Sequence, residues 1–224
     1  MVVTLLADGY RVGLAVARVL RDSTQTHEIH RVEEITGRPR YRRLLVELAA
    51  TSDGRRLLAE RPELSTQHVD YDRLRALPDT TLGGTYVRHL DNNHITADYQ
   101  AAATRHVDDP DIAYLMRRFR QTHDVWHALL GLGIEGHEEV LVHWFSWGQL
   151  RLPVSAMIML FGSLKHIVLE RRWATLRHSA LEAYRDGRDA APLLGVYWED
   201  LWALPLDHVR SAYGVAPLDK RYLA

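Results

Sequence analysis

The sequence predicts an all-α fold, a single-domain multi-helix bundle that covers residues 1–224. Apolar residues recur with the helical period along most of the chain, and no segment shows the strict alternation of a half-buried strand. No repeat, low-complexity stretch or linker divides the chain, and 224 residues suit one large domain. These observations predict helices packed around one core.

Proline, glycine and capping residues bound the expected helices. We expect helices at residues 8–21, 40–50, 53–60, 70–76, 82–91, 94–104, 110–131, 137–150, 153–171, 173–186 and 206–213. The first is amphipathic and has no charged leader before its apolar part, so we interpret it as a helix and not as a signal or transit peptide. The longest mostly apolar stretch, residues 152–164, is shorter than the roughly 18 residues that a membrane span needs. We therefore expect a cytoplasmic protein, and peripheral contact with the inner membrane stays open.

Composition excludes several classes of site. The chain has no cysteine, which excludes disulfides, thiolate metal sites and cysteine nucleophiles. The net charge is −1, and no basic block stands out among the 28 lysines and arginines. Nucleic acid is therefore not an expected partner, because binding its phosphates needs clustered positive charge.

The helix expected at 110–131 carries the most informative pattern. With about 100° per residue, Ile112 and Phe119 fall on one apolar face. His123 and His127 lie within the same face, one turn apart, and Asp124 lies at its edge. Two imidazoles at this spacing can bind one metal ion from a single helix. A divalent cation would also offset the cost of burying these polar groups. The alternative is a pair of hydrogen-bonded core histidines with Asp124 exposed.

The next helix, at 137–150, is apolar on almost every side and begins with Glu138 and Glu139. Carboxylates in a first turn also suit the helix dipole, which is the simpler explanation for both. A hairpin between the two helices would bring this turn beside His123 and His127, so we expect one of the two glutamates to complete the site. Spacing alone does not choose between them. We interpret His143 as structural, with a role as a further ligand left open.

Four collinear blocks carry a family resemblance. His123, Asp124, His127 and Glu139 match the pattern HDxxHx(11)E of the Coq-four family of ubiquinone-biosynthesis proteins. LPDTTLGGTYVRHL (77–90), FGSL (161–164) and VYWEDLWALPLDHVRSAYGV (196–215) resemble further elements of that family, and the likeness covers roughly residues 40–218. The resemblance implies an all-helical fold with a Zn²⁺ site at His123, Asp124, His127 and Glu139, and so selects Glu139 over Glu138.

The resemblance also implies a function. Members bind polyprenylated quinone precursors, help to organise the other quinone-biosynthesis enzymes at the membrane, and are linked to oxidative decarboxylation at ring carbon C1. On this hypothesis Asp124 and His127 act in catalysis through the metal, which binds the substrate carboxylate or adjoining hydroxyl as a Lewis acid. Ligand types leave Fe²⁺ or Mn²⁺ open as the native ion. Four apolar residues near the site are candidates to line a prenyl channel, unless they are simply core: Phe119, Trp126, Met157 and Phe161.

Two other functions remain open at this stage. The chain could be a lipid-binding scaffold with a structural metal, which presents an intermediate to partner enzymes without catalysis. It could also be a metal-dependent hydrolase, because His123-Asp124 resembles the dyad of HD phosphohydrolases; that chemistry needs an upstream histidine, His94 or His106. A homodimer is among the assemblies that the sequence allows.

Overall fold

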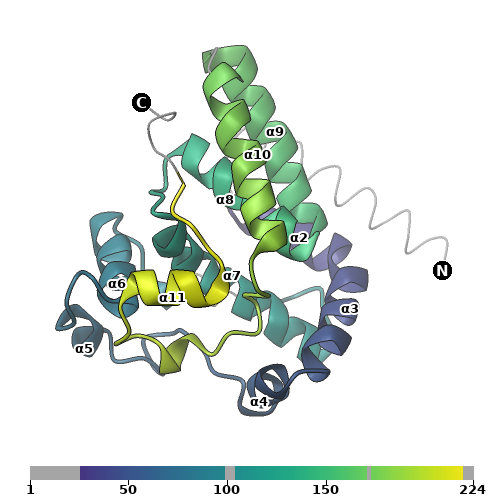
Figure 1. The fold of residues 1–224 in the computed structure, drawn as a ribbon. Coiled ribbons are helices and arrows are strands. Elements are labelled where there is room, and N and C mark those ends of the chain that lie inside the picture. Colours follow the sequence, from purple (N-terminus) through teal and green to yellow (C-terminus); the bar gives the residue numbers. More distant parts are fainter. Residues whose placement is uncertain (1–25, 99–103, 171–172, 219–224) are drawn as a thin grey trace.

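The computed structural model describes residues 26–98, 104–170 and 173–218, and within them the fold is all-α (Figure 1). The described residues form no strand, and the bridge between Thr81 and Pro205 is an isolated pair. The helices are α2 (Thr26–Thr36), α3 (Arg38–Ala49), α4 (Ser52–Glu60), α5 (Tyr71–Arg75), α6 (Leu82–Asn92), α7 (Pro110–Leu130), α8 (Gly136–Leu150), α9 (Pro153–Glu170), α10 (Trp173–Asp189) and α11 (Leu206–Tyr213), with a short 3₁₀ helix η2 (Trp198–Asp200). The predicted fold class is confirmed.

Helix α7 passes through the middle of the molecule (Figure 1). The Asp109 carboxylate accepts hydrogen bonds from the backbone N–H groups of Asp111 and Ile112, and Pro110 occupies the first turn. The helix ends at Gly131, whose φ of 69° is a left-handed conformation that glycine adopts without strain. Most side chains of α7 are buried, including polar ones. Polar groups on this helix must therefore find partners inside the protein.

The helices that follow α7 form a layer of their own. Helices α8, α9 and α10 lie side by side, and α8 packs against both of the others (Figure 1). Gly187 on α10 lies against the backbone of Phe145 on α8, where a β-carbon would collide with it. Helix α6 contacts α7 from another side. The end of α7 is also tied to the last part of the chain, because the N–H of Leu218 donates to the Leu130 carbonyl.

One hydrophobic core joins these elements and includes side chains from Tyr41 to Leu218. Two buried arginines of α7, Arg118 and Arg120, form ion pairs next to this core. Arg118 is fully buried and binds both carboxylate oxygens of Glu199. A single core over this length identifies the described part as one domain.

The structure differs from the expected helices in two places. Helix α2 was not predicted, because two positions on its buried side are occupied by Glu33 and Glu34 and not by apolar residues. Their carboxylates pair with Arg120 of α7 at 2.7 and 3.0 Å, a partner that local sequence does not reveal. The helix expected at 94–104 is wrong where the chain is described: His94 has a φ of 56°, and only a short 3₁₀ turn follows at 97–98. The helix expected at 8–21 lies outside the described residues.

Among the described residues, no helix combines the length and the hydropathy that crossing a bilayer requires.

Candidate metal centre

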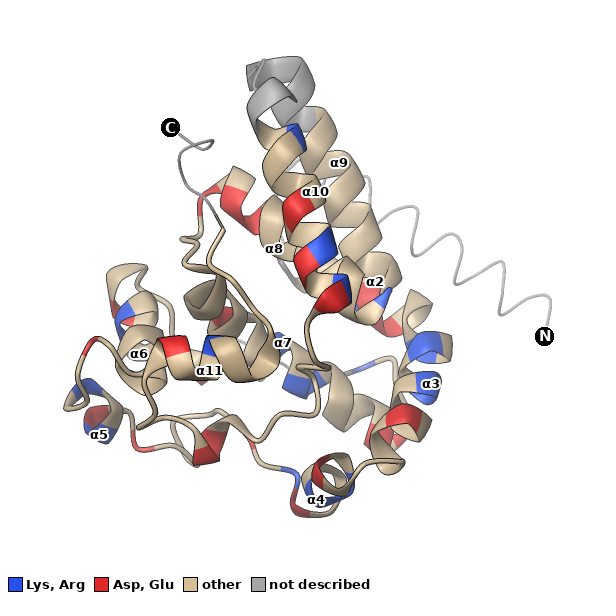
Figure 2. Ribbon diagram, in the orientation of Figure 1, with Lys and Arg blue, Asp and Glu red and all other residues tan. Residues whose placement is uncertain are grey.

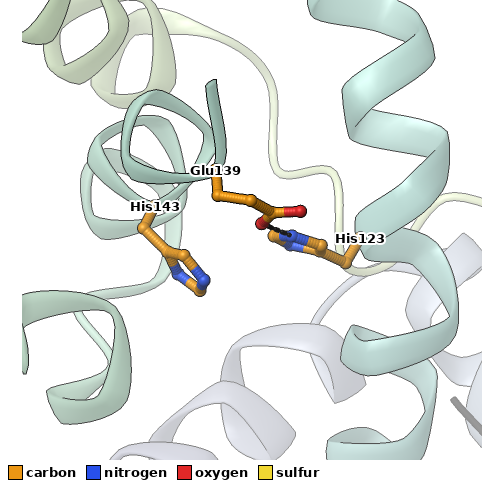
Figure 3. Close-up of side chains that lie close together, drawn as sticks. All are labelled: His123, Glu139 and His143. Carbon is orange, nitrogen blue, oxygen red and sulfur yellow. Dashed lines mark hydrogen bonds and ion pairs between the residues drawn. The ribbon is translucent and has the colours of Figure 1, made fainter. Parts of the chain in front are cut away.

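The hairpin of α7 and α8 brings together three side chains of the predicted site. His123 and His127 lie one turn apart on α7, and their Nε2 atoms are 3.1 Å apart. Glu139, in the first turn of α8, places Oε2 3.4 Å from His123 Nε2 and Oε1 3.5 Å from His127 Nε2. Figure 3 shows the Glu139 carboxylate directed at the His123 ring. Three side chains from two helices therefore bring four donor atoms, two imidazole nitrogens and both carboxylate oxygens of Glu139, close together.

These separations fit a metal ion. Metal–nitrogen and metal–oxygen bonds of about 2.1 Å in a tetrahedral site put neighbouring donors about 3.4 Å apart. The three measured separations are 3.1, 3.4 and 3.5 Å. Two imidazole nitrogens and one carboxylate are also a donor set that zinc, iron and manganese accept. The residues present thus match the ion that the sequence motif implies.

The loop between α7 and α8 orients His127. Its Nδ1 lies 2.8 Å from the carbonyl oxygen of Gly133. Because a carbonyl oxygen only accepts, Nδ1 carries the proton of this bond, and Nε2 faces His123 and Glu139. Metal-bound histidines are commonly held in this way by a backbone carbonyl behind the ring.

Asp124 is buried beside the cluster, with 3% of its surface exposed. Its Oδ2 has no hydrogen-bond partner in the described structure, and the charges of His123, His127 and Glu139 all act on it. Burial raises the pKa of this carboxyl, and the two histidines only partly offset that effect. A buried carboxylate without a partner is costly, and a cation is the kind of group that would offset the cost. The role of Asp124 as a ligand stays a prediction.

The structure distinguishes the roles of Glu138 and Glu139, which their spacing in the sequence could not do. Glu138 turns back to the start of α8, where it forms a capping box with Glu135. Its Oε2 lies 3.3 Å from the Glu135 backbone nitrogen. Glu139 faces the two histidines. The different directions follow from helix geometry, which rotates neighbouring side chains by about 100°.

Electrostatics couple His127 and Glu139. Burial disfavours the charged form of His127, but the Glu139 carboxylate, Asp124 and the bond to Gly133 outweigh it and raise its pKa. Burial also acts against the charge on Glu139, yet His127 and His123 lower the pKa of Glu139 well below its usual value. The raised pKa of His127 means that protons compete with a metal ion for this imidazole.

Two further histidines lie at the ends of the cluster. The His89 ring, from α6, stacks on His127 with centroids 5.1 Å apart. The His143 ring, from α8, lies 5.1 Å from that of His123. Sequence reasoning missed His89 because its place depends on how α6 packs against α7. Its position among buried residues of α6, such as Tyr86 and Leu90, is the signal that could have found it.

The four predicted channel residues divide into two groups. Phe119 packs edge-on against His123, with centroids 6.2 Å apart, and also against Trp126. Trp126 is fully buried and continues into the core through Phe145. Met157 and Phe161 are half-buried on α9, and Met157 packs against the hydrophobic core. In this set it is thus the Phe119 ring that packs against a predicted metal ligand, His123.

His94 and His106, the upstream histidines of the hydrolase hypothesis, are not part of the described cluster. His94 is exposed at the left-handed turn after α6. The backbone of His106 donates to Glu34, on the side of α7 that binds α2. The upstream histidine that does reach the motif is His89.

Fold and site together define an all-helical protein with a candidate metal centre of histidine and carboxylate groups. The sequence pattern of the family described as "Coenzyme Q (ubiquinone) biosynthesis protein Coq4" matches residues 10–219, and the chain belongs to this family. It is therefore a ubiquinone-biosynthesis protein.

Two similar insect proteins support the assignment to this family. A protein of Drosophila ananassae named "Ubiquinone biosynthesis protein COQ4 homolog, mitochondrial" is 33% identical over 208 residues, which cover 93% of this chain and 77% of the relative. A Culex quinquefasciatus protein named "Ubiquinone biosynthesis protein COQ4 homolog 1, mitochondrial" is 36% identical over 185 residues, 83% of this chain and 66% of the relative. Both insect proteins are thus named as mitochondrial.

A crystal structure from Nostoc punctiforme, titled as that of a "Putative ubiquinone biosynthesis protein", has the same fold. It superposes with a TM-score of 0.73 at 23% identity, over 92% of this chain and 97% of that chain.

Proposed function

We propose that this ubiquinone-biosynthesis protein binds a polyprenylated ring precursor at a divalent-metal centre and catalyses its oxidative decarboxylation. In this reaction the C1 carboxylate leaves as carbon dioxide and a hydroxyl takes its place. The observation that carries the proposal is the convergence of His123, His127 and Glu139, whose donor atoms are 3.1–3.5 Å apart. The family to which the chain belongs indicates the pathway, which is ubiquinone biosynthesis.

The exposure of the cluster favours catalysis over a purely structural ion. His127 is fully buried, but 36% of the Glu139 side chain is exposed. A ligand can approach from that side, whereas a structural metal site is usually closed by four protein groups. A divalent ion bound here supplies Lewis acidity toward a carboxylate or an adjoining hydroxyl.

The residues of the chain have separate tasks in this proposal. His127, held from behind by Gly133, presents Nε2 in a fixed direction. Asp124 adds negative charge at a buried position, which increases the affinity of the pocket for a cation. Phe119 covers one edge of His123 with an apolar ring. That surface suits the prenyl chain next to the polar ring, with Trp126 behind it.

The native ion decides where the electrons come from. Replacing a carboxyl by a hydroxyl with molecular oxygen releases carbon dioxide and water and consumes two electrons. Zinc has no redox chemistry, so with zinc the ring itself would supply the two electrons, and the hydroxylated product would be released as its quinone. Iron or manganese would allow oxygen to react at the ion, and the donor set accepts either.

Other quinone-biosynthesis enzymes and the membrane are the proposed partners. Residues 153–164 of α9 include no charged side chain (Figure 2), and Leu160 and Leu164 in this segment are 63% and 52% exposed. We assign to this face a peripheral contact with lipid, because exposed leucines are stabilised at an apolar interface. Met157 and Phe161 lie on the same helix, which would let a prenyl chain pass from lipid toward the core. A cytoplasmic location and a homodimer stay predictions.

A direct assay tests the proposal. The protein is supplied with a prenylated ring acid that keeps its C1 carboxylate, with metal and oxygen, and release of carbon dioxide and the C1-hydroxylated ring are followed. We expect turnover by the wild type, and we expect Asp124→Asn and His127→Ala to bind lipid but lose turnover. A folded variant that binds no metal but restores quinone synthesis in a cell lacking the gene would contradict catalysis. That result would favour a non-catalytic scaffold.

A further inference from the structure

The candidate metal centre lies within a row of four imidazole rings. Going along the row, His89, His127, His123 and His143 have successive centroid separations of 5.1, 4.8 and 5.1 Å. The two inner rings belong to the sequence motif, and the two outer rings come from α6 and α8. The outer rings differ in how they relate to the donor atoms of Glu139.

His143 is the outer ring that meets the donor atoms. It lies one turn after Glu139 on α8, so both side chains leave the same face of that helix. One donor atom from each of His123, Glu139 and His143 lies within 4.8 Å of the other two. Figure 3 shows the His143 and His123 rings on opposite sides of the Glu139 carboxylate, with space between them. Donor atoms around one tetrahedral ion lie about 3.4 Å apart, so binding would bring the three side chains closer together.

Hydrogen bonding does not explain the burial of His143. Only 9% of its surface is exposed. In the described part of the chain, the hydrogen-bond partner of the ring is Ser155 Oγ on α9, at 3.5 Å from Nδ1. That distance is at the outer limit for a hydrogen bond. A buried imidazole normally has a stronger partner than this, and a bound metal ion would provide one.

We propose that His143 provides a third imidazole ligand to the ion bound by His123 and Glu139. The proposal rests on the metal centre of the proposed function and extends its ligand set beyond the four residues of the motif. A third nitrogen donor changes which ion the site prefers, because imidazole suits zinc, copper, iron and nickel, while oxygen donors suit manganese and magnesium. The expected occupant is a borderline first-row divalent ion.

X-ray absorption of the zinc-loaded full chain tests this directly, because it counts imidazole ligands per zinc. We expect three imidazoles in the wild type and two in His143→Leu. The affinities for Zn²⁺ and Mn²⁺ are measured in parallel by competition with a chromophoric chelator. We expect His143→Leu to weaken zinc binding about tenfold or more and manganese binding less, so that the preference for zinc falls. His208→Gln, an exposed histidine on α11, is the control and should change neither value.

The count in the wild type does not depend on whether the variant folds. Two imidazoles per zinc in the wild type, or an unchanged ratio of affinities in a folded His143→Leu, would overturn this inference and leave the metal centre intact. A wild type that binds no divalent ion would overturn both the inference and the proposed function.

Discussion

At the scale of single residues, the neighbours Glu138 and Glu139 differ in what their carboxylates contact. Glu138 caps the start of α8, and Glu139 faces His123 and His127. Helical periodicity and the expected hairpin predict that one of them reaches the histidines. Spacing could not choose between the two, because the choice depends on the phase in which α8 begins, and the capping box of Glu135 and Glu138 sets that phase.

Matched substitutions separate the two roles. We expect Glu139→Gln to weaken zinc binding about tenfold or more, because it removes a charged donor. We expect Glu138→Gln to leave zinc affinity within about twofold and to cost at most about 1 kcal/mol of stability, the typical value of a helix cap. Isothermal titration with Zn²⁺ and denaturant unfolding of the same samples measure both. Equal losses of affinity would mean that both glutamates serve only the helix dipole.

The burial of Asp124 leads to a prediction about the stability of the metal-free protein. Burial raises its pKa in the folded protein, so its contribution to stability is full below the unfolded value of 3.8 and is lost as pH rises through the folded value. At pH 7 the burial of this carboxyl group therefore costs the metal-free protein stability. We expect Asp124→Asn to raise the melting temperature of the metal-free protein at pH 7 by roughly 2–4 °C, the shift that about 1 kcal/mol produces in a domain of this size.

The same variant should bind metal more weakly, because the buried charge that destabilises the metal-free protein attracts the ion. Thermal melts with a chelator and with zinc measure both effects, and the gain in the chelated sample should shrink toward pH 4. A lower melting temperature of Asp124→Asn without metal at pH 7 would show that Asp124 is already satisfied by the protein.

At the scale of elements, the sequence predicts best the helices whose buried faces are apolar. Helix α7 was expected at 110–131 and spans Pro110–Leu130, because Asp109, Pro110 and Gly131 mark its ends. Helix α2 escaped prediction because its buried side includes acidic residues that pair with Arg120. His89 escaped for a related reason: its contact with His127 exists only once α6 and α7 are packed. Long-range pairing, and not local propensity, decides both cases.

The exposed apolar face of helix α9 leads to a prediction about membrane binding. The double variant Leu160→Asp/Leu164→Asp places charge on its exposed apolar face, and we expect about tenfold weaker binding to vesicles of phosphatidylcholine and phosphatidylglycerol. The control is Val46→Asp, at a position on α3 that is 72% exposed. Co-sedimentation with the vesicles measures the bound fraction. An equal effect of the two changes, or none from the double variant, would remove α9 as the lipid-binding face.

At the scale of the whole molecule, the fold serves to bring α6, α7 and α8 to one cluster of imidazoles and carboxylates. The resemblance in the sequence predicted the family, and the match over residues 10–219 confirms it. What the sequence could not provide is the environment of the cluster, namely the Gly133 carbonyl behind His127 and the outer rings of His89 and His143. The identity of the ion and its role in catalysis are proposals.

The central claim is that His123 and His127 hold a metal ion, and the metal content of the purified protein tests it most directly. Elemental mass spectrometry should find close to one equivalent of divalent metal per wild-type chain. We expect the folded double variant His123→Ala/His127→Ala to contain almost none, because removing two of the three converging donors leaves Glu139 and Asp124 without the nitrogen ligands of the site. Stoichiometric metal in the double variant would contradict the account.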